Sequence, residues 1–334
     1  MFDQKWKEIL QEVKDNGITV KRGEKRAFIE KISYQFQIDD PKDRIIFNKN
    51  FNLNIFQCIG QFLWITQGSF NAETITYYAP FSSKYSSDGF KMIGAYGPRL
   101  FGIHHLEQIK HVINVLDGDT SRRRAVASIY LPQFDQHKTA DEVPCTLNLQ
   151  YLVREQKVQS ITYMRSQNAF RLLPYDVFLF TMLQEYVNAV LTTAHNTELG
   201  KYHHYSGSFH IYIDELDLIK NVLEDNTNET FQMKSMPSKN IILRLQKLNR
   251  FESIVRTTIS SHEKRNNSVD FDFLFEICEE WFDDPYWKQF ALLLICYGAI
   301  IMKNDEKRDR AISSLEPIYK YMVQMYIDKK ANSS

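Results

Sequence analysis

The chain has 334 residues and a formal net charge of zero, because its 41 Lys and Arg residues balance its 41 Asp and Glu residues. A neutral chain is not drawn to nucleic acid or to an anionic membrane by its overall charge, so no nucleic-acid or membrane partner is expected. A chain of this length can bury a large core, and the 23 Phe and 18 Tyr against 12 Gly and 9 Pro indicate an ordered globule.

Cysteine usage indicates a reducing compartment. The chain has four cysteines whose spacing matches no metal site: Cys58, Cys145, Cys278 and Cys296. The N-terminus carries no signal-peptide pattern, so we expect a cytoplasmic protein. The most apolar run, residues 290–302, is shorter than the roughly 20 residues of a membrane-spanning helix and predicts a buried helix instead.

Three amphipathic helices are predicted in the first part of the chain. Apolar residues recur at helical spacing over residues 2–15, 54–66 and 104–116, and Gln61 lies on the second helix. The basic segment 21–26 is either a solvated loop or an anion-binding turn. A strand region follows it over residues 27–36.

Turn and strand signals dominate the middle of the chain. Residues 94–99 contain two glycines and predict a turn that lets a ligand approach the backbone closely. The arginine run 122–124 precedes a predicted strand and is either a solvated charge run or a phosphate clamp, because guanidinium groups bind phosphate through paired hydrogen bonds. The predicted strands cover residues 125–131, 145–153 and 158–164.

The remainder is predicted to be mostly helical. A long apolar helix is expected over residues 175–191, then a β segment over 201–212 and a short strand over 240–245. The β segment contains three histidines, but their spacing fits no helical metal-binding pattern, so no metal site is expected. Residues 273–297 and 309–328 predict helices within a C-terminal extension.

Several separated motifs occur in a fixed order. They are Arg123-Arg124 before a strand, Pro144-Cys145, Arg165-Ser166 followed by Phe170 and Leu173-Pro174, and Gly207 with His210 and Tyr212; upstream stand Leu63-Trp64, Gln67-Gly68, Asn71 and Tyr96-Gly97. In this order and spacing the chain resembles the thymidylate synthase family over about residues 5–250. The resemblance implies an α/β (α+β) catalytic domain over residues 1–260, built on a large mixed sheet with packed helices, and a helical extension over residues 265–334.

The resemblance also implies that Cys145 is a catalytic nucleophile. Its thiolate would add to C6 of a pyrimidine nucleoside 5′-monophosphate, so that C5 attacks a one-carbon unit carried by 5,10-methylenetetrahydrofolate. An isolated cysteine is otherwise a buried core residue, and the flanking motifs favour the nucleophile. Tyr96 and Gln61 occupy two further catalytic positions; Gln61 replaces a glutamate of the family, and an amide positions water but does not exchange a proton.

Phosphate binding is expected to be shared between two subunits. In the family four arginines and a serine hold the phosphate, which here implies Arg22, Arg165 and Ser166 from one subunit and Arg123 and Arg124 from its partner. Such sharing implies a homodimer whose subunits pair through their sheets.

Two residues near the end of the resemblance match the family's sugar-binding pair. His210 and Tyr212 correspond to the side chains that contact the sugar hydroxyl. Their spacing alone also fits strand residues that fill a core.

Asp176 departs from the family in a way that bears on the substrate. Thymidylate synthases have an asparagine there, whose amide donates to O4 and accepts from N3–H of uracil. Cytosine offers an acceptor at N3 and donors at N4, so a carboxyl side chain suits it better. The deoxycytidylate and cytidylate 5-hydroxymethylases of the family share this replacement, which predicts CMP or dCMP as substrate. Asp176 would alternatively cap the helix that follows Pro174.

The cofactor side departs as well. Asn168 replaces an aspartate that binds the pterin of the folate, and Leu172 replaces a glycine in the same region. The leading prediction is a cytidylate 5-hydroxymethylase in which water completes the product. The alternatives are a thymidylate synthase that methylates dUMP, or a catalytically impaired nucleotide-binding or regulatory homologue.

Overall fold

The computed structural model of the protein describes residues 1–23, 25–86, 88–102, 107–136, 143–227, 229–265 and 269–332. Its centre is a six-stranded sheet in the order β1-β2-β6-β5-β4-β3. Neighbouring strands are antiparallel except for the parallel pair β5 and β6. The strands are β1 (Ile18–Arg22), β2 (Lys25–Ile38), β3 (Val126–Ser128), β4 (Thr146–Arg154), β5 (Lys157–Asn168) and β6 (Glu198–Tyr212).

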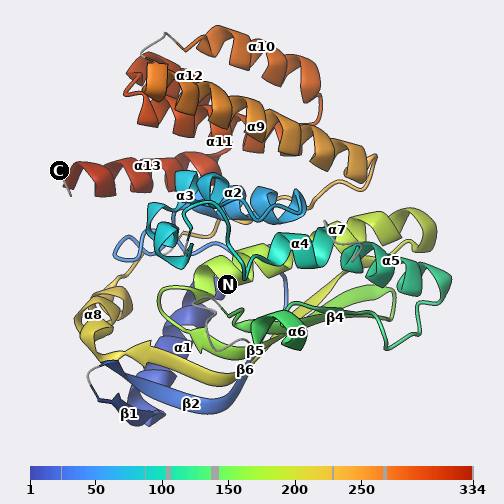
Figure 1. Ribbon diagram of the computed structural model, residues 1–334, viewed down its shortest axis with the longest axis vertical. Coiled ribbons are helices and arrows are strands. Elements are labelled where there is room, and N and C mark those ends of the chain that lie inside the picture. The colour runs from blue at the N-terminus through green and yellow to red at the C-terminus, as the bar shows by residue number, and fades with distance from the viewer. Residues whose placement is uncertain are drawn as a thin grey trace.

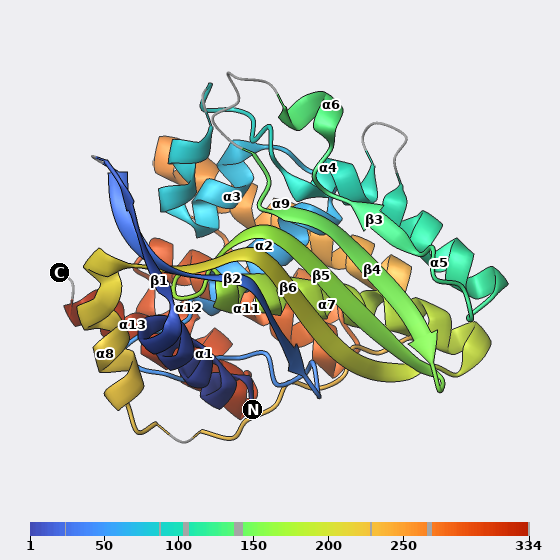
Figure 2. The same cartoon turned by 90° about the horizontal axis from the view of Figure 1, so that it is seen from below.

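Most of the helices lie on one side of this sheet (Figure 1). Figure 2 looks onto the opposite face, where no described helix crosses β4, β5 or β6. The predicted α/β class, with a large mixed sheet and packed helices, is confirmed. The helices are α1 (Phe2–Asn16), α2 (Ile55–Thr66), α3 (Ala72–Tyr78), α4 (Tyr96–Phe101), α5 (Gln108–Gly118), α6 (Pro132–Asp135), α7 (Leu173–His195), α8 (Leu216–Glu224), α9 (Ile241–Arg265), α10 (Phe271–Trp281), α11 (Pro285–Ile301), α12 (Asp305–Ser313) and α13 (Pro317–Asn332), with 3-10 turns at Pro80–Tyr85 and Ile213–Glu215.

Helix α7 forms the crossover between the two parallel strands. Pro174 stands in its first turn, where a missing N–H costs no hydrogen bond, and Asn196 ends it in the left-handed conformation with φ of 49°. Because β5 and β6 run the same way, their carboxyl ends meet at one edge of the sheet, where Asn168 pairs with His210. A site built at this edge draws on both strands and on the start of α7.

Helix α1 fixes the segment that follows β5. The indole nitrogen of Trp6 donates a 2.8 Å hydrogen bond to the carbonyl of Ala169, and its ring stacks on Phe170 at 6.2 Å between centroids. Trp6 is fully buried. The first helix of the chain therefore fixes the turn between β5 and α7 through Trp6.

The C-terminal helices pack against the rest of the protein through α2. Helices α9, α11 and α13 all contact α2, and α11 contributes side chains that are almost completely buried, among them Phe290, Leu293 and Ile295. The prediction of a buried helix over residues 290–302 is confirmed. Among the described helices, none has both the length and the apolar character that a membrane span requires.

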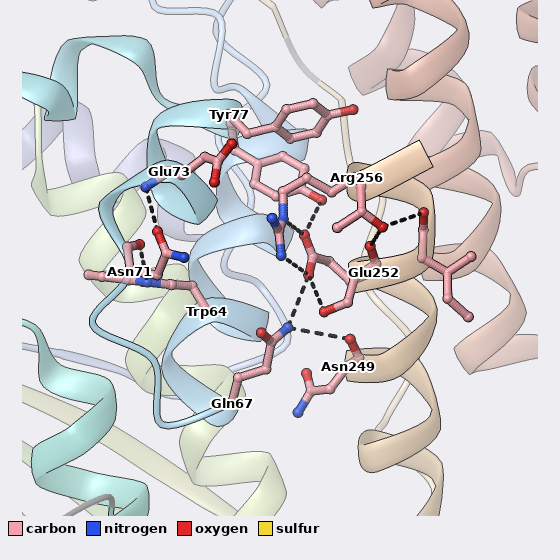
Figure 3. A network of polar contacts seen from close by, with 12 residues as sticks. Trp64, Gln67, Asn71, Glu73, Tyr77, Asn249, Glu252 and Arg256 are labelled. Carbon is pink, nitrogen blue, oxygen red and sulfur yellow. Dashed lines mark hydrogen bonds and ion pairs between the residues drawn. The ribbon is translucent and has the colours of Figure 1, made fainter. Parts of the chain in front are cut away.

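A buried polar cluster joins α2 to α9, as Figure 3 shows. Glu252 of α9 is completely buried and accepts hydrogen bonds from Arg256 Nε at 2.7 Å and from Gln67 Nε2 at 3.1 Å. Because a buried carboxylate is stable only when it is paired, these contacts fix α9 in place over the end of α2.

The predicted strand over residues 240–245 is wrong. These residues begin α9, whose buried side chains Leu245, Leu248 and Val255 follow the spacing of a helix. A short run of apolar residues does not distinguish a strand from a buried helix turn, and the continuation of the pattern beyond residue 245 decides for the helix.

Three further predictions in the middle of the chain need correction. The turn predicted at residues 94–99 is largely helix α4, and a Cβ on Gly97 would lie 2.9 Å from the carbonyl oxygen of Ser69, so the close approach is to backbone and not to a ligand. The strand predicted over 125–131 is only Val126–Ser128. The helix predicted at 104–116 is observed as α5 from Gln108, and residues 103–106 lie outside the described part.

Candidate active site

One cavity of about 790 Å³ opens at the edge where β5 and β6 end. It gathers residues that are distant in the sequence, from the N-terminal hairpin to the last helix. Its lining includes Arg26, Phe51, Phe81, Tyr85, Tyr96, Cys145, Met164, Ser166, Gln167, Asn168, Arg171, Leu172, Tyr175, Asp176, His210, Tyr212, Glu215 and Lys329. Most of the residues that the sequence predicted for the site therefore lie together.

Cys145 stands immediately before β4 and is half-buried in the cavity wall. Its carbonyl accepts a 2.8 Å hydrogen bond from the backbone N–H of Arg165, so the strand pairing extends to the nucleophile position. The other three cysteines are buried in the core, and burial raises the pKa of Cys58, Cys278 and Cys296. Among the four thiols, only that of Cys145 lines the cavity.

Arg165 holds the segment that carries Cys145. Its guanidinium donates to the carbonyl of Pro144 at 2.9 Å and to that of Val143 at 2.8 Å. The side chain is exposed and does not line the cavity. In this chain by itself, Arg165 fixes the segment before Cys145, and its predicted phosphate contact stays a prediction.

Tyr96 begins α4 and lines the same cavity as Cys145. Its hydroxyl accepts a 3.1 Å hydrogen bond from Thr146, the residue after Cys145. Burial raises the pKa of Tyr96, and the neighbouring Cys145 and Asp176 raise it further. The phenol therefore keeps its proton at neutral pH.

Asp176 lies in the first turn of α7 and turns into the cavity. The side-chain amide of Gln167, itself only 1% exposed, donates a 2.8 Å hydrogen bond to Asp176 Oδ2. Burial raises the pKa of Asp176 to about 7, and this hydrogen bond opposes the rise. The carboxyl group therefore titrates near neutrality, which Asp residues in water do not do.

Asn168 and Leu172 flank the turn between β5 and α7. Asn168 is 7% exposed, and its Oδ1 accepts a hydrogen bond from the backbone N–H of Arg171. Leu172 is 37% exposed and places its side chain at the cavity wall. Ser166 lines the cavity from β5, as predicted for a phosphate ligand.

The far end of the cavity is formed by β6 and the N-terminal hairpin. His210 lies 5.3 Å from the ring of Phe28, and Arg26 stacks over the ring of Tyr212 at 3.9 Å. The guanidinium of Arg26 also pairs with Asp214, with a shortest hydrogen bond of 2.5 Å. Arg26 belongs to the basic segment 21–26, which the sequence left open as a loop or an anion-binding turn.

Four predicted residues whose side chains are described do not line this cavity, namely Arg165 and the three named next. Gln61 is partly exposed on α2, and Arg123 and Arg124 are exposed before β3. Arg22 ends β1, and its side chain lies outside the described part of the structure. The positions of Arg123 and Arg124 leave them available to a second subunit.

Several lining residues were not identified from the sequence, among them Gln167 and Lys329. Gln167 lies inside the Arg165-Ser166 motif, but nothing in the motif indicates that its side chain meets Asp176. Lys329 comes from α13, and its Nζ donates a 3.2 Å hydrogen bond to the carbonyl of Phe51. Burial and the nearby Arg171 lower the pKa of Lys329.

We call the part of the cavity wall formed by Phe51, Leu172 and Tyr175 the outer wall, and it suits a folate cosubstrate. These side chains present apolar and aromatic surface of the kind that stacks on a flat heterocycle. Arg171 and Lys329 add cations that suit the carboxylates of such a molecule. Within the described residues, no group of three or more His, Cys, Asp or Glu side chains is placed to hold a metal ion.

The chain is similar to proteins of known families over most of its length. A family model described as "Thymidylate synthase" matches residues 4–257. A "Deoxyuridylate hydroxymethyltransferase" of Bacillus phage SP01 is 28% identical over 215 residues, which cover 61% of this chain and 55% of that protein. A protein of the same name from Delftia phage PhiW-14 is 30% identical over 209 residues, covering 59% and 56%.

A "Thymidylate synthase" of Staphylococcus haemolyticus is 26% identical over 125 residues, which cover 37% of each protein. The chain spans about half the length of the phage proteins that it matches, 55% and 56%. The similarity includes Cys145, Asp176 and the rest of the cavity up to Glu215 within the family match, and it ends before α13.

Proposed function

The chain belongs to the thymidylate synthase family, and we propose that it transfers a one-carbon unit to C5 of a pyrimidine nucleoside 5′-monophosphate. The observation that carries the proposal is the presence of Cys145 and Asp176 in the wall of one cavity, a thiol able to activate the base and a carboxyl group able to read its edge. Within this proposal we favour a hydroxymethyltransferase that acts on CMP or dCMP.

Cys145 carries the covalent chemistry. Its thiolate forms a bond from Sγ to C6, and the electron pair of the C5–C6 double bond makes C5 nucleophilic. Methylenetetrahydrofolate, when bound, supplies the carbon that C5 attacks. C5 would then give its proton to water, and the bond between the transferred carbon and the folate nitrogen would break, so that tetrahydrofolate leaves and that carbon is doubly bonded to C5. Water would add its hydroxyl group to the transferred carbon, and the bond between Sγ and C6 would break to regenerate the C5–C6 double bond and free Cys145.

Tyr96 has a supporting role. It keeps its proton at neutral pH because burial raises its pKa, so it acts as a hydrogen-bonding group beside Cys145. Gln61 does not line the cavity, so its predicted role of positioning water stays a prediction, and its amide cannot take the proton from C5. A hydroxymethyl product, completed by water, needs no hydride transfer.

Asp176 supports a cytosine base. A carboxyl group that titrates near pH 7 can share a proton with N3 of cytosine and accept a hydrogen bond from N4. His210 and Tyr212, at the other end of the cavity, are proposed to bind the sugar.

Uracil is the second candidate base, because the phage relatives are named deoxyuridylate hydroxymethyltransferases. An ionised Asp176 would accept the N3–H of uracil. A thymidylate synthase that acts on dUMP is the corresponding alternative reaction.

We also propose a homodimer that pairs through the open face of the sheet. Ile161 and Tyr163 of β5 and Tyr205 of β6 lie on this face, where the two tyrosine rings stack at 5.5 Å and Tyr205 is 40% exposed. Apolar and aromatic surface that no described helix covers is typical of an interface. Such pairing would bring Arg123 and Arg124 to the partner's phosphate, beside Ser166 and Arg165.

The test is a product assay by mass spectrometry with CMP, dCMP and dUMP, each with methylenetetrahydrofolate. We expect a hydroxymethyl group on CMP or dCMP and none with Cys145→Ala. A methyl group on dUMP together with dihydrofolate would establish the thymidylate synthase reaction instead. Tight nucleotide binding without product, and without release of tritium from C5, would establish a regulatory homologue.

A further inference from the structure

The contact between Gln167 and Asp176 leaves one carboxyl oxygen for a ligand. Gln167 Nε2 donates to Asp176 Oδ2 at 2.8 Å and to the carbonyl of Asn168 at 3.3 Å, so both of its N–H bonds are used. Among the described side chains, Gln167 alone donates a hydrogen bond to this carboxyl group. Oδ1 therefore remains as the oxygen that meets a base.

The position of Gln167 makes this arrangement rigid. The side chain is 1% exposed on β5, and its Oε1 is buried without a hydrogen-bond partner among the described residues. Leaving a buried amide oxygen without a hydrogen bond costs free energy. In the observed orientation Oε1 lacks a hydrogen bond, and the side-chain N–H groups of Gln167 donate to Asp176 and to the carbonyl of Asn168. The packing around Gln167 therefore keeps its side-chain N–H directed at Asp176.

We propose that Gln167 is a positioning residue that directs Oδ1 of Asp176 to the ring nitrogen N3 of the base, so that the proton on this oxygen decides between cytosine and uracil. The inference rests on the proposed function and deepens it by naming what determines base choice. A hydrogen bond donated to Oδ2 leaves Oδ1 as the atom that gains or loses the proton.

The two bases then require opposite protonation states. Cytosine has a lone pair at N3, so its complex with Oδ1 must contain one shared proton. Uracil carries its own hydrogen at N3, so it requires Oδ1 without a proton. Cytidylate binding therefore takes up a proton when free Asp176 is ionised, and uridylate binding releases one when free Asp176 is protonated.

Several other groups near Asp176 bear on its charge. Tyr96 of α4 and Tyr202 of β6 interact with it electrostatically, and burial raises the pKa of both, so they stay neutral. Arg171 lines the same cavity but is paired with Glu215 at 2.9 Å. The remaining titratable groups in the cavity wall are Cys145, His210, Tyr85, Tyr175, Tyr212, Arg26, Lys84 and Lys329.

The experiment is isothermal titration calorimetry of dCMP and dUMP between pH 5.5 and 8.5, in the whole 334-residue chain with Cys145→Ala. That change prevents covalent addition and removes the titration of the thiol. Both nucleotides carry the same phosphate, so its own titration cancels in the ratio of their dissociation constants. We expect the ratio of the Kd of dCMP to that of dUMP to rise by up to about tenfold for each pH unit through the titration of Asp176.

Gln167→Met tests the positioning role, because it keeps the side-chain length and removes the donor. Loss of a donor to the carboxylate favours the protonated form, so the pH at which the two nucleotides bind equally should move upward by about one pH unit. Asp176→Asn should abolish the pH dependence of the ratio, and adding Gln167→Met to it should change nothing. Gln246→Met, on α9 and away from the cavity, should leave the ratio unchanged.

The outcomes separate this inference from the proposed function. If the chain with intact Gln167 binds none of CMP, dCMP and dUMP, both are overturned. If it binds nucleotides with a ratio that does not change with pH, or if Gln167→Met leaves the ratio unchanged, only the role of Gln167 is overturned. Should Gln167→Met fail to fold, proton uptake by dCMP measured in buffers of different ionisation enthalpy tests the same claim in the chain with Cys145→Ala alone.

Discussion

The hydroxyl of Tyr78 donates a 2.9 Å hydrogen bond to the buried carboxylate of Glu252, 174 positions away in the sequence. This bond joins α3 to α9 within the cluster of Figure 3, in which Arg256 and Gln67 bind the same carboxylate. The layer that carries α2 and the layer that carries the C-terminal helices are therefore connected through one buried charge.

The first prediction concerns this charge. Glu252→Ala should lower the free energy of unfolding by about 3–5 kcal/mol, because it leaves Arg256 buried without its partner. Tyr78→Phe removes one hydrogen bond and should cost only about 1–2 kcal/mol. Urea denaturation measures both changes, and equal costs for the two variants would contradict the assignment of Glu252 as the centre of the cluster.

The second prediction concerns Cys145. Cys145→Ser should lower turnover and tritium release from C5 by at least about 1000-fold, because a serine hydroxyl is not ionised at neutral pH without a strong base nearby. Nucleotide binding should persist within a few-fold, since Cys145 is not expected to bind the phosphate or the sugar. Cys278→Ser, a change in the core at a buried thiol, serves as the control for general damage; turnover that survives in Cys145→Ser would exclude the covalent mechanism.

The third prediction concerns stability and pH. Burial raises the pKa of Asp176 from 3.8 to about 7. Between these two pH values Asp176 is therefore ionised in the unfolded chain and protonated in the folded chain. Stability due to this group therefore falls as pH rises from about 4 to 7 and is constant above. A difference of one in pKa between the folded and unfolded chain corresponds to about 1.4 kcal/mol, so Asp176→Asn should stabilise the protein by a few kcal/mol at pH 8 and by little at pH 4.

Thermal unfolding of Asp176→Asn and the unchanged chain across this range measures the effect. A difference in Tm that grows from pH 4 to pH 7 is the expected result. A difference that is constant with pH, or that shrinks as pH rises, would mean that Asp176 is ionised throughout.

The fourth prediction concerns the open face of the sheet. Ile161→Asp should convert the dimer to monomers, because it places a charge in an apolar interface. Ile242→Asp, at a position of α9 that is 50% exposed, should leave the dimer intact. Analytical ultracentrifugation distinguishes these outcomes, and an unchanged sedimentation coefficient for Ile161→Asp would place any interface elsewhere.

The fifth prediction concerns the last helix. Lys329→Met should raise the KM for the folate cosubstrate by about 3–10-fold while the KM for the nucleotide changes little, because Lys329 lines the outer cavity and a cation there attracts carboxylates. The effect should weaken in high salt. Lys320→Met, at an exposed position of the same helix, is the matched control; equal effects of the two changes would assign the loss to the helix as a whole.

Much of the architecture could be predicted because it is encoded locally. Helical spacing placed α1 and α2 within a residue or two, and the two predicted strands 145–153 and 158–164 correspond to β4 and β5. The error at residues 240–245 arose because a short apolar run has no period of its own, and only the length of α9 resolved it. The division into domains at residues 260 and 265 stays a prediction.

The features of the site also divide into those that the sequence predicts and those that depend on tertiary packing. The sequence by itself determined which residue types belong together, because Cys145, Ser166, Asp176 and His210 stand in motifs of fixed order. The tertiary structure alone decided that Gln167 donates to Asp176, that Arg165 binds the carbonyls of Val143 and Pro144, and that Lys329 reaches the cavity from the last helix. A linear pattern records which face of an element is buried, but the partner across that face depends on how β5, α7 and α13 pack, and packing is a property of the whole chain.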